Sequence, residues 1–396
     1  MFRFIHTSDW HLGQNFYGYD RGVEQRYMLR QLAAIVAEQR PDALLVSGDI
    51  YHTPSPSSSA VSLYVKSMLE IHDACPKMSI IVIAGNHDSA ARLESDSLLW
   101  KLAGVTVLGG ITRNSDGTAD LDHHLVRVKD RGIVAAVPFG YSASFPQVPG
   151  NTVDRDHRQQ AYFQALLDQA VSQNPDGLPI VLMAHLAVST SIYTGHDSTV
   201  LMDSVPLAEL GSGYDYTALG HIHHPQALSP NAHYCGTPLP VSFDEKCEHA
   251  VSLVEIAAHG SKPVVHRHVI KNIRPLHTIP STPADFDTAL EQLQGLSEEN
   301  AYVRLNVFVD GNLPHDAQTR AAEVLAEKNC RYCCIKRNLT ATAAAQTPRK
   351  MHLEELSAKQ PIDVANQFFT DKTGNAMTDL QREMFNEALQ QVRSEE

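Results

Sequence analysis

Short apolar runs alternate with amphipathic stretches along the first two-thirds of the chain. Strands are predicted at residues 2–9, 43–49, 78–88 and 178–185. The runs at 43–49 and 78–88 are apolar enough to indicate strands buried on both faces. Stretches with apolar residues at helical spacing lie at residues 26–42, 57–76, 89–104 and 157–174. Further strand-like runs lie at residues 123–128, 132–140, 214–220, 233–243, 250–258 and 264–270. This alternation predicts an α/β fold with sheets layered between helices.

The pattern changes near residue 272. Three prolines and a short helix precede a strand at 301–310, a helix at 315–329 and a strand at 330–338, which together form a compact β-α-β-α-β unit. Residues 340–350 are small and polar, as in a linker, and the tail from about Met351 is helical in pattern. We therefore predict three parts, at residues 1–272, 273–340 and 341–396.

Composition limits the classes of protein that remain. The 396 residues are 43% hydrophobic and carry a net charge of -13, so the chain can build a core, whereas its surface repels nucleic acid and membranes. A phosphate-bearing substrate must then be attracted locally, by bound metal or by a basic patch. The start of the chain lacks the features of a signal peptide and no run approaches about 20 apolar residues, so we expect a cytoplasmic protein without membrane contact. The single C-x-x-C at Cys330–Cys333 has no second pair, and we expect six reduced thiols.

Polar residues that bind metals recur where the predicted strands end. The segments SDWHLG, SGDIYH, GNHD, MAH and GHIHH each follow an apolar run, and most contain a glycine. Ligand sites in open α/β sheets lie beyond the carboxyl ends of the strands, so these segments are expected to meet. Side chains two apart in an extended segment share a face, which would point His221 and His223 the same way. The candidate ligands are Asp9, His11, Asp49, Asn86, His185, His221 and His223.

Seven ligands are too many for one zinc ion, which takes about four, and they suit two cations that share a carboxylate. Mixed oxygen and imidazole ligands favour manganese, iron or zinc over calcium. Each residue also has a simpler interpretation, such as a turn aspartate at Asp49 or a core histidine at His185. Five such segments at five successive strand ends favour the metal site.

These motifs resemble the calcineurin-like metallophosphoesterases. More closely, HTSDWHLG, GDIYH, GNHD, GHIH and YCGTPLPVSFDE resemble the SbcD family, the nuclease subunits of bacterial SbcCD complexes, from residue 1 to about residue 340. Protein phosphatases usually read G-D-x-x-D-R-G where this chain reads GDIYHTP. Cys235 departs from the family, which commonly has serine before that glycine.

The resemblance implies two packed sheets flanked by helices, a small α+β capping domain that touches DNA, and a C-terminal helical arm that binds an SbcC-type ATPase. It implies one metal held by Asp9, His11, Asp49 and His223, and another held by Asp49, Asn86, His185 and His221. Two Mn²⁺ ions are expected, with Mg²⁺ as an alternative. His87 would face the scissile phosphate, and Asp88 would orient the His87 ring.

The implied activity is hydrolysis of DNA phosphodiesters, as a 3′-5′ exonuclease on duplex ends and an endonuclease on single strands and hairpins. The ATPase would gate duplex cleavage, the chain would form a homodimer, and the role would lie in DNA repair, recombination and replication. His52 follows Asp49 closely enough to reach substrate, whereas His224 is expected to be a plain loop residue. Candidate DNA contacts are Arg267, Lys271 and Arg274, with Arg331, Lys336 and Arg337 in the capping unit, unless these are ordinary solvated side chains.

Two alternatives use the same residues differently. A phosphoesterase could act on small nucleotides or phosphoproteins with the same metals. A scaffold could organise the ATPase without catalysis, although a scaffold has no need of seven converging ligands.

Overall fold

The computed structural model describes residues 1–193, 204–297, 300–309, 313–326, 328–339, 361–373 and 376–395. These residues form two compact units. The first comprises Met1–Thr278, Ser297–Arg304 and Leu325–Cys334, and the second comprises Ile279–Leu296, Leu305–Val324 and Ile335–Glu396.

The first unit contains two six-stranded sheets. One has the order β16 (Val264–Val269), β15 (Ala250–Ile256), β1 (Phe2–Thr7), β4 (Ala43–Ser47), β5 (Ser79–Ile83), β6 (Val105–Leu108). The other has the order β13 (Gln226–Ser229), β14 (Ala232–Tyr234), β12 (Tyr216–Gly220), β9 (Ile180–His185), β8 (Gly132–Val137), β7 (Leu125–Val128). Strands β1, β4, β5 and β6 are parallel to one another, as are β8, β9, β12 and β14.

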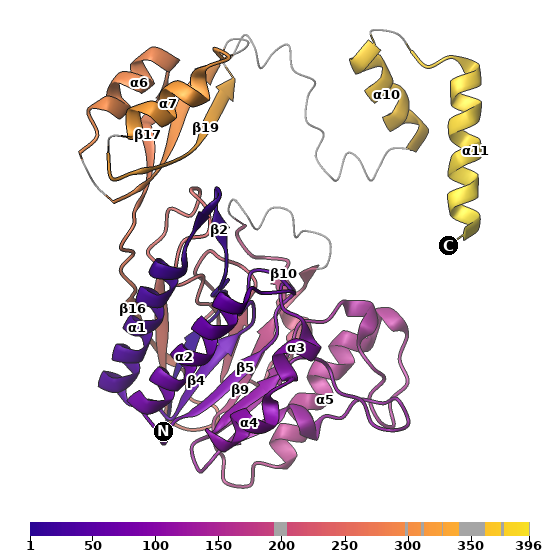
Figure 1. The fold of residues 1–396 in the computed structure, drawn as a ribbon. Helices are drawn as coiled ribbons and strands as arrows, with labels where there is room; N and C mark the ends of the chain where they lie inside the picture. The colour runs from indigo at the N-terminus through magenta and orange to yellow at the C-terminus, as the bar shows by residue number, and fades with distance from the viewer. Residues whose placement is uncertain are drawn as a thin grey trace. The chain divides into compact units, whose positions relative to one another are not determined.

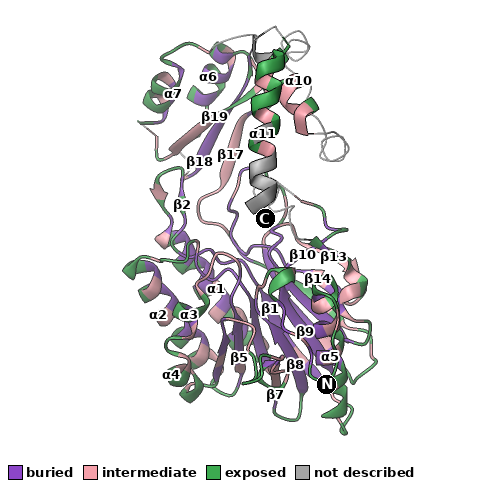
Figure 2. Cartoon of the chain, turned by 90° about the vertical axis from the view of Figure 1, so that its right-hand side faces the viewer, coloured by how far each residue is buried: buried purple, intermediate pink, exposed green. Residues whose placement is uncertain are grey.

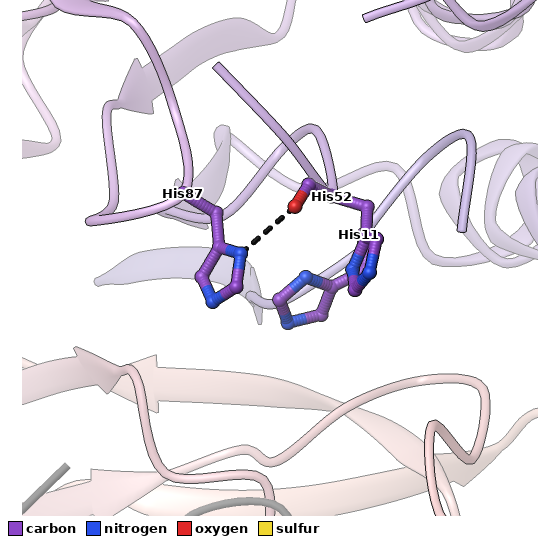
Figure 3. A group of neighbouring side chains, drawn as sticks. All are labelled: His11, His52 and His87. Carbon is purple, nitrogen blue, oxygen red and sulfur yellow. Dashed lines mark hydrogen bonds between the residues drawn. The ribbon is translucent and has the colours of Figure 1, made fainter. Parts of the chain in front are cut away.

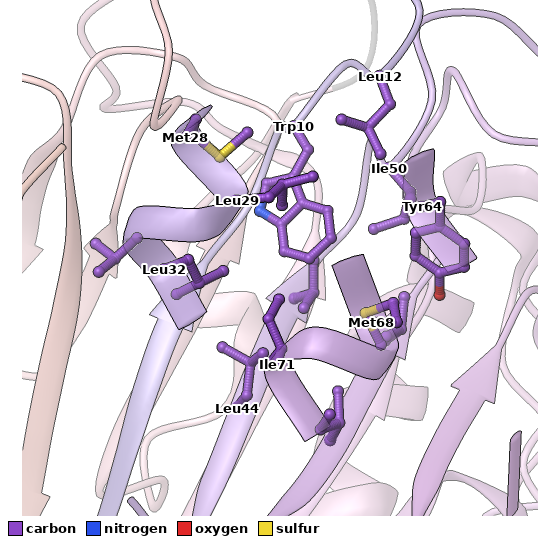
Figure 4. Packing of buried hydrophobic residues seen from close by; sticks show 14 of the residues in the cluster. Trp10, Leu12, Met28, Leu29, Leu32, Leu44, Ile50, Tyr64, Met68 and Ile71 are labelled. Atoms are coloured by element: carbon purple, nitrogen blue, oxygen red, sulfur yellow. The ribbon is translucent and has the colours of Figure 1, made fainter. Parts of the chain in front are cut away.

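Helices cover the outer face of each sheet (Figure 1). Helices α1 (Gly22–Gln39) and α2 (Ser58–Ala74) pack on the first sheet, and α5 (Arg158–Ser172) packs on the second. Figure 4 shows part of the first of these layers, a cluster that includes Met28 and Leu32 of α1 and Met68 and Ile71 of α2. A third cluster, which includes Phe4, Leu45 and Met183, lies between the two sheets. The predicted α/β sandwich with helices on both faces is confirmed.

Burial explains why these runs form strands. Every residue of β4, β8, β9 and β12 is buried, so continuous apolar runs are required where a sheet is covered on both faces (Figure 2). Helix α2 begins where the Ser57 side chain accepts a hydrogen bond from the Ala60 N–H, as its serine-rich start predicted.

Three sequence predictions need correction. Residues 89–104 form two short helices, α3 (Ala90–Glu94) and α4 (Ser97–Leu102), rather than one. Within 233–243, strand structure is confined to the end of β14. Strand β12 ends at Gly220, and His221 has φ 101°, so His221 and His223 do not lie in an extended strand.

The remaining elements follow the prediction for the later chain. A three-stranded sheet has the order β17 (Leu276–Ala284), β18 (Tyr302–Val309), β19 (Arg331–Leu339), with helices α6 (Phe286–Gln294) and α7 (Ala317–Ala326). The tail contains α10 (Pro361–Thr373) and α11 (Asp379–Glu395), whereas the predicted linker at 340–350 lies outside the described residues. Short strand pairs complete the structure, at β2 (Asn15–Phe16) with β3 (Tyr19–Asp20) and β10 (Ala187–Val188) with β11 (Ser204–Val205).

The structure has all six cysteines as thiols. No helix within the described part of the chain is long and apolar enough to cross a bilayer.

Candidate metal centre

Five parallel strands deliver the predicted ligands to one place. The loops after β1 and β4 are joined by backbone hydrogen bonds from Asp9 N–H to Gly48 O (2.9 Å) and from His11 N–H to Asp49 O (3.0 Å). Positive φ angles occur at Asp9 (54°), His11 (45°), Asp49 (52°) and His221 (101°), which is uncommon for residues with a side chain. Such strain concentrates at functional sites, and here it turns four polar side chains towards the same point.

The first group of side chains contains Asp9, His11 and His223. Their ligand atoms lie within 4.8 Å of one another, and the Nε2 atoms of His11 and His223 are 3.1 Å apart. The backbone N–H of His221 donates to both Asp9 oxygens, at 3.1 and 3.2 Å, which fixes that carboxylate. All three side chains are buried.

The second group contains Asn86, His185 and His221. The Asn86 Oδ1 atom lies 3.1 Å from His185 Nε2 and 2.8 Å from His221 Nδ1, and these two nitrogens are 3.3 Å apart. The Nδ1–H of His185 donates to the Ser47 carbonyl at 2.8 Å, which leaves the lone pair on Nε2 facing Asn86 and His221.

Asp49 lies between the two groups. Its Oδ2 is 3.7 Å from His11 Nε2, and its Oδ1 is 3.5 Å from His185 Nε2. The Oδ1 atom also accepts the backbone N–H of His87 at 2.9 Å. One carboxylate thus presents an oxygen to each group, which is the arrangement a bridging ligand requires.

Burial sets the protonation of the cluster. It lowers the pKa of His185 to about 3 and lowers the pKa of His221 well below its usual value, so both rings are neutral near pH 7. Burial also raises the pKa of Asp49 to about 6, partly offset by His87. Neutral imidazoles beside carboxylates that are costly to desolvate are typical of a site that gains a cation.

The donor set fits divalent metals. Metal–ligand bonds of about 2.1 Å place neighbouring ligand atoms about 3.0–3.4 Å apart. The nitrogen–nitrogen distances of 3.1 and 3.3 Å fall in that range. Among the described residues, the candidate metal-binding groups all belong to this centre and include no cysteine. The roles of the individual ligands stay a prediction.

His87 lies at the edge of the centre beside His11 and His52 (Figure 3). Its Nδ1–H donates to the His52 carbonyl at 2.8 Å, and its ring stacks on that of His52 with centroids 5.6 Å apart. Both side chains are half-buried, which suits groups that meet a substrate.

The prediction that Asp88 orients His87 is corrected by these contacts. The Asp88 carboxylate accepts the backbone N–H groups of Ile50 (3.0 Å), Tyr51 (2.9 Å) and Gly85 (2.9 Å), and so ties the loop after β5 to the loop after β4. Burial and the nearby Asp49 raise the pKa of Asp88 to about 7. The His52 carbonyl supplies the orienting contact instead.

Sequence reasoning missed Glu245. This buried carboxylate has Oε1 3.8 Å from His223 Nδ1 and accepts from the Thr237 hydroxyl at 3.1 Å. It is placed to fix the His223 ring on the side away from the metal groups. It lies in the quoted SFDE segment, but no spacing rule connects it to a histidine 22 positions earlier.

The predicted basic contacts divide into two kinds. Arg267 and Lys271 are exposed. Arg274 is engaged within the first unit, with Nε 3.0 Å from the Glu24 carboxylate and its guanidinium over the Tyr302 ring. Its side chain is 14% exposed, so Arg274 is not available as the DNA contact that was predicted.

Comparisons with known proteins agree with this geometry. Residues 2–225 match the calcineurin-like phosphoesterase family, and residues 272–373 match a family described as the type 5 capsule protein repressor C-terminal domain. The chain is 34% identical over 282 residues to the SbcD protein of the SbcCD nuclease of Rhodobacter capsulatus, covering 67% of this chain and 68% of that protein. It is 29% identical over 353 residues to the SbcD protein of Escherichia coli K12, covering 82% of each. It is 28% identical over 335 residues to that of Bacillus subtilis, covering 82% of this chain and 80% of that protein.

The sandwich and its strand-end cluster define a metal-dependent phosphoesterase. The chain belongs to the calcineurin-like phosphoesterases and, within them, to the SbcD family of nuclease subunits.

Proposed function

We propose that this chain is the DNA nuclease subunit of an SbcCD complex and hydrolyses DNA phosphodiesters with two Mn²⁺ ions. The observation that carries the proposal is the position of Asp49, whose two oxygens lie 3.7 Å from His11 and 3.5 Å from His185, one residue of each of two adjoining ligand groups. One group is Asp9, His11 and His223, and the other is Asn86, His185 and His221. Ions held there would supply Lewis acidity towards a phosphate and lower the pKa of a water molecule.

Side chains beside the metal ligands would contact the substrate phosphate and supply a proton. The His52 carbonyl accepts the His87 Nδ1–H and fixes the ring, and His87 would meet a phosphate at the rim. It would stabilise charge on the phosphate or protonate the leaving oxygen. His52, stacked on His87, would contact the same phosphate. Asp88 ties the loop after β4 to the loop after β5 and takes no direct part in catalysis.

DNA is favoured over the small nucleotides and phosphoproteins of the alternative function. The relatives that cover most of the chain are named as nuclease subunits, and their similarity extends beyond the phosphoesterase domain. The complete donor set argues against a non-catalytic scaffold. Arg267 and Lys271 remain the candidate DNA contacts, and residues 273–340 are proposed as the capping domain.

Partner binding is proposed for the C-terminal arm, residues 341–396. Leu380 and Met384 of α11 are 67% and 62% exposed, which leaves apolar surface uncovered on an amphipathic helix. A helix of this kind docks on a groove or a coiled coil, which fits an SbcC-type ATPase.

A homodimer is proposed through α4. Leu98, Leu99 and Leu102 are 77%, 66% and 88% exposed on this six-residue helix. Such a patch on a soluble chain is typical of an interface, and a self-complementary patch gives a two-fold dimer. Leu98→Ser with Leu102→Ser should convert dimer to monomer in sedimentation velocity, whereas the neighbouring Lys101→Ser should not. Equal masses for all three proteins would exclude this surface.

The function is tested by comparing substrates. The purified chain is incubated with Mn²⁺ and a labelled DNA hairpin, a DNA duplex, a mononucleotide ester or a phosphopeptide, with and without the ATPase and ATP. We expect hairpin opening, and duplex degradation that requires the ATPase. Faster turnover of the ester or the phosphopeptide than of the hairpin would support the alternative. An Asp49→Asn preparation controls for contaminating nuclease.

A further inference from the structure

A cavity lies at the ends of the strands opposite to those that carry the metal ligands. It has a volume of about 510 Å³ and is lined by the turn before β4, the turn before β5 and the β7–β8 turn. These are the amino-terminal ends of β4, β5 and β8, whereas the metal ligands follow the carboxyl-terminal ends of their strands. The volume is that of a pocket for a small organic molecule.

The lining is cationic although the chain is acidic. Arg40, Lys77, Lys129 and Arg131 surround the cavity, against two carboxylates, Asp42 and Asp130. The net charge of the chain is -13, so a site with two surplus positive charges is a marked local reversal.

The two carboxylates already have partners within the protein. Arg131 Nε lies 3.5 Å from Asp42 and 3.6 Å from Asp130, and Asp42 also accepts the Arg3 N–H at 2.9 Å. Lys129 Nζ donates to the uncharged Lys77 carbonyl at 2.7 Å. Within the described part of the chain, Arg40, Lys77 and Lys129 form no ion pair with a carboxylate.

The backbone holds two of these cations in an unfavourable conformation. Arg40 and Lys129 have φ of 46° and 47°, where glycine or asparagine is lower in energy. Seven residues other than glycine have positive φ in the described chain, and four of them belong to the metal centre. Two of the other three line this single cavity: Arg40 is the left-handed residue that ends α1, and Lys129 lies in the β7–β8 turn.

We propose that this cavity binds a small phosphate-bearing anion of nucleotide size. Lys129, Lys77 and Arg40 would pair with the phosphate, and Pro41, Pro76 and Val128 would contact the apolar part of the molecule. The proposal is independent of the metal centre and of the DNA substrate. Its ligand could be a nucleoside monophosphate or free phosphate, which share the recognised group.

Cys75 provides a local readout because its thiol lines the cavity and is half-buried. The rate of Cys75 alkylation in the full chain is measured by peptide mass spectrometry with AMP, with inorganic phosphate and with adenosine. We expect AMP to slow the reaction in a saturable way and adenosine to have no effect, while alkylation of Cys247 stays unchanged. If inorganic phosphate protects as well as AMP does, the phosphate group is sufficient for binding. If AMP protects and inorganic phosphate does not, the nucleotide is the ligand.

Lys129→Gly with Arg40→Gly tests the charges without endangering the fold. Glycine relieves the positive φ at both positions, so urea unfolding should need the same or a higher concentration. The concentration of AMP that gives half-protection should rise at least about tenfold, as expected for loss of one or more charged contacts. Lys101→Gly with Lys262→Gly, at exposed sites that do not line the cavity, should leave this concentration unchanged. No protection at millimolar AMP, equal protection by adenosine, or unchanged protection in the cavity variant would overturn the proposal.

Discussion

Individual residues in this chain obtain their chemistry from the backbone that holds them. Asp9, His11, Asp49 and His221 adopt positive φ, and this conformation, which turns their side chains towards the metal centre, is not visible in the sequence motifs. His87 differs from them, because it touches the cluster at its edge and its ring is fixed by the His52 carbonyl at 2.8 Å.

A substitution at His87 should therefore separate binding from turnover. His87→Ala should keep its metal content, since His87 is not among the proposed ligands, and should lose about 10²–10⁴-fold in hairpin cleavage rate. Metal analysis and single-turnover kinetics on the same preparation measure both. The exposed His123→Ala serves as the matched control. Loss of one metal from His87→Ala would make His87 a ligand and contradict the role proposed for it.

Most elements could be predicted because their signals are local. Fully buried strands such as β4 and β9 are apolar runs in the sequence, and the helices α1, α2 and α5 are amphipathic stretches. The predictions were wrong where tertiary contacts determine the conformation or the partners of a residue. The stretch at 89–104 breaks into α3 and α4, and Asp88 turned out to bind three backbone N–H groups from two different loops. Glu245 reaches His223 only through the fold, so no sequence spacing could reveal it.

The loop after β4 offers a test of how elements build the site. A Cβ on Gly48 would overlap His185 Nδ1, whereas one on Gly117 would meet nothing within 4 Å, and the two glycines have nearly equal φ of 86° and 85°. Gly117→Ala should cost about 1–2 kcal/mol from its φ alone. Gly48→Ala should cost several kcal/mol and lower the metal content, because His185 must move. Urea unfolding and metal analysis of both variants give the comparison, and equal behaviour would show that Gly48 does not position His185.

At the scale of the whole molecule, catalysis and partner binding are proposed for different parts of the chain. A chain ending at Gln346 should keep metal binding and single-strand cleavage but lose co-purification with the ATPase and ATP-dependent duplex cleavage.

In the full chain, Leu380→Ser with Met384→Ser should weaken co-purification through loss of apolar contact, while the exposed Glu383→Ser should not. A truncated chain that still captures the ATPase at full affinity would remove the arm from the interface.

The central claim is a two-metal centre bridged by Asp49, and the number of metal ions per chain tests it most directly. After dialysis against Mn²⁺ and removal of free metal, plasma mass spectrometry should find about two ions per wild-type chain, the number that a shared carboxylate between two ligand groups requires. Asp49→Asn should hold fewer than about one, because the charged bridge serves both ions. Two ions retained in Asp49→Asn, or a single ion in a fully active wild-type chain, would contradict the account.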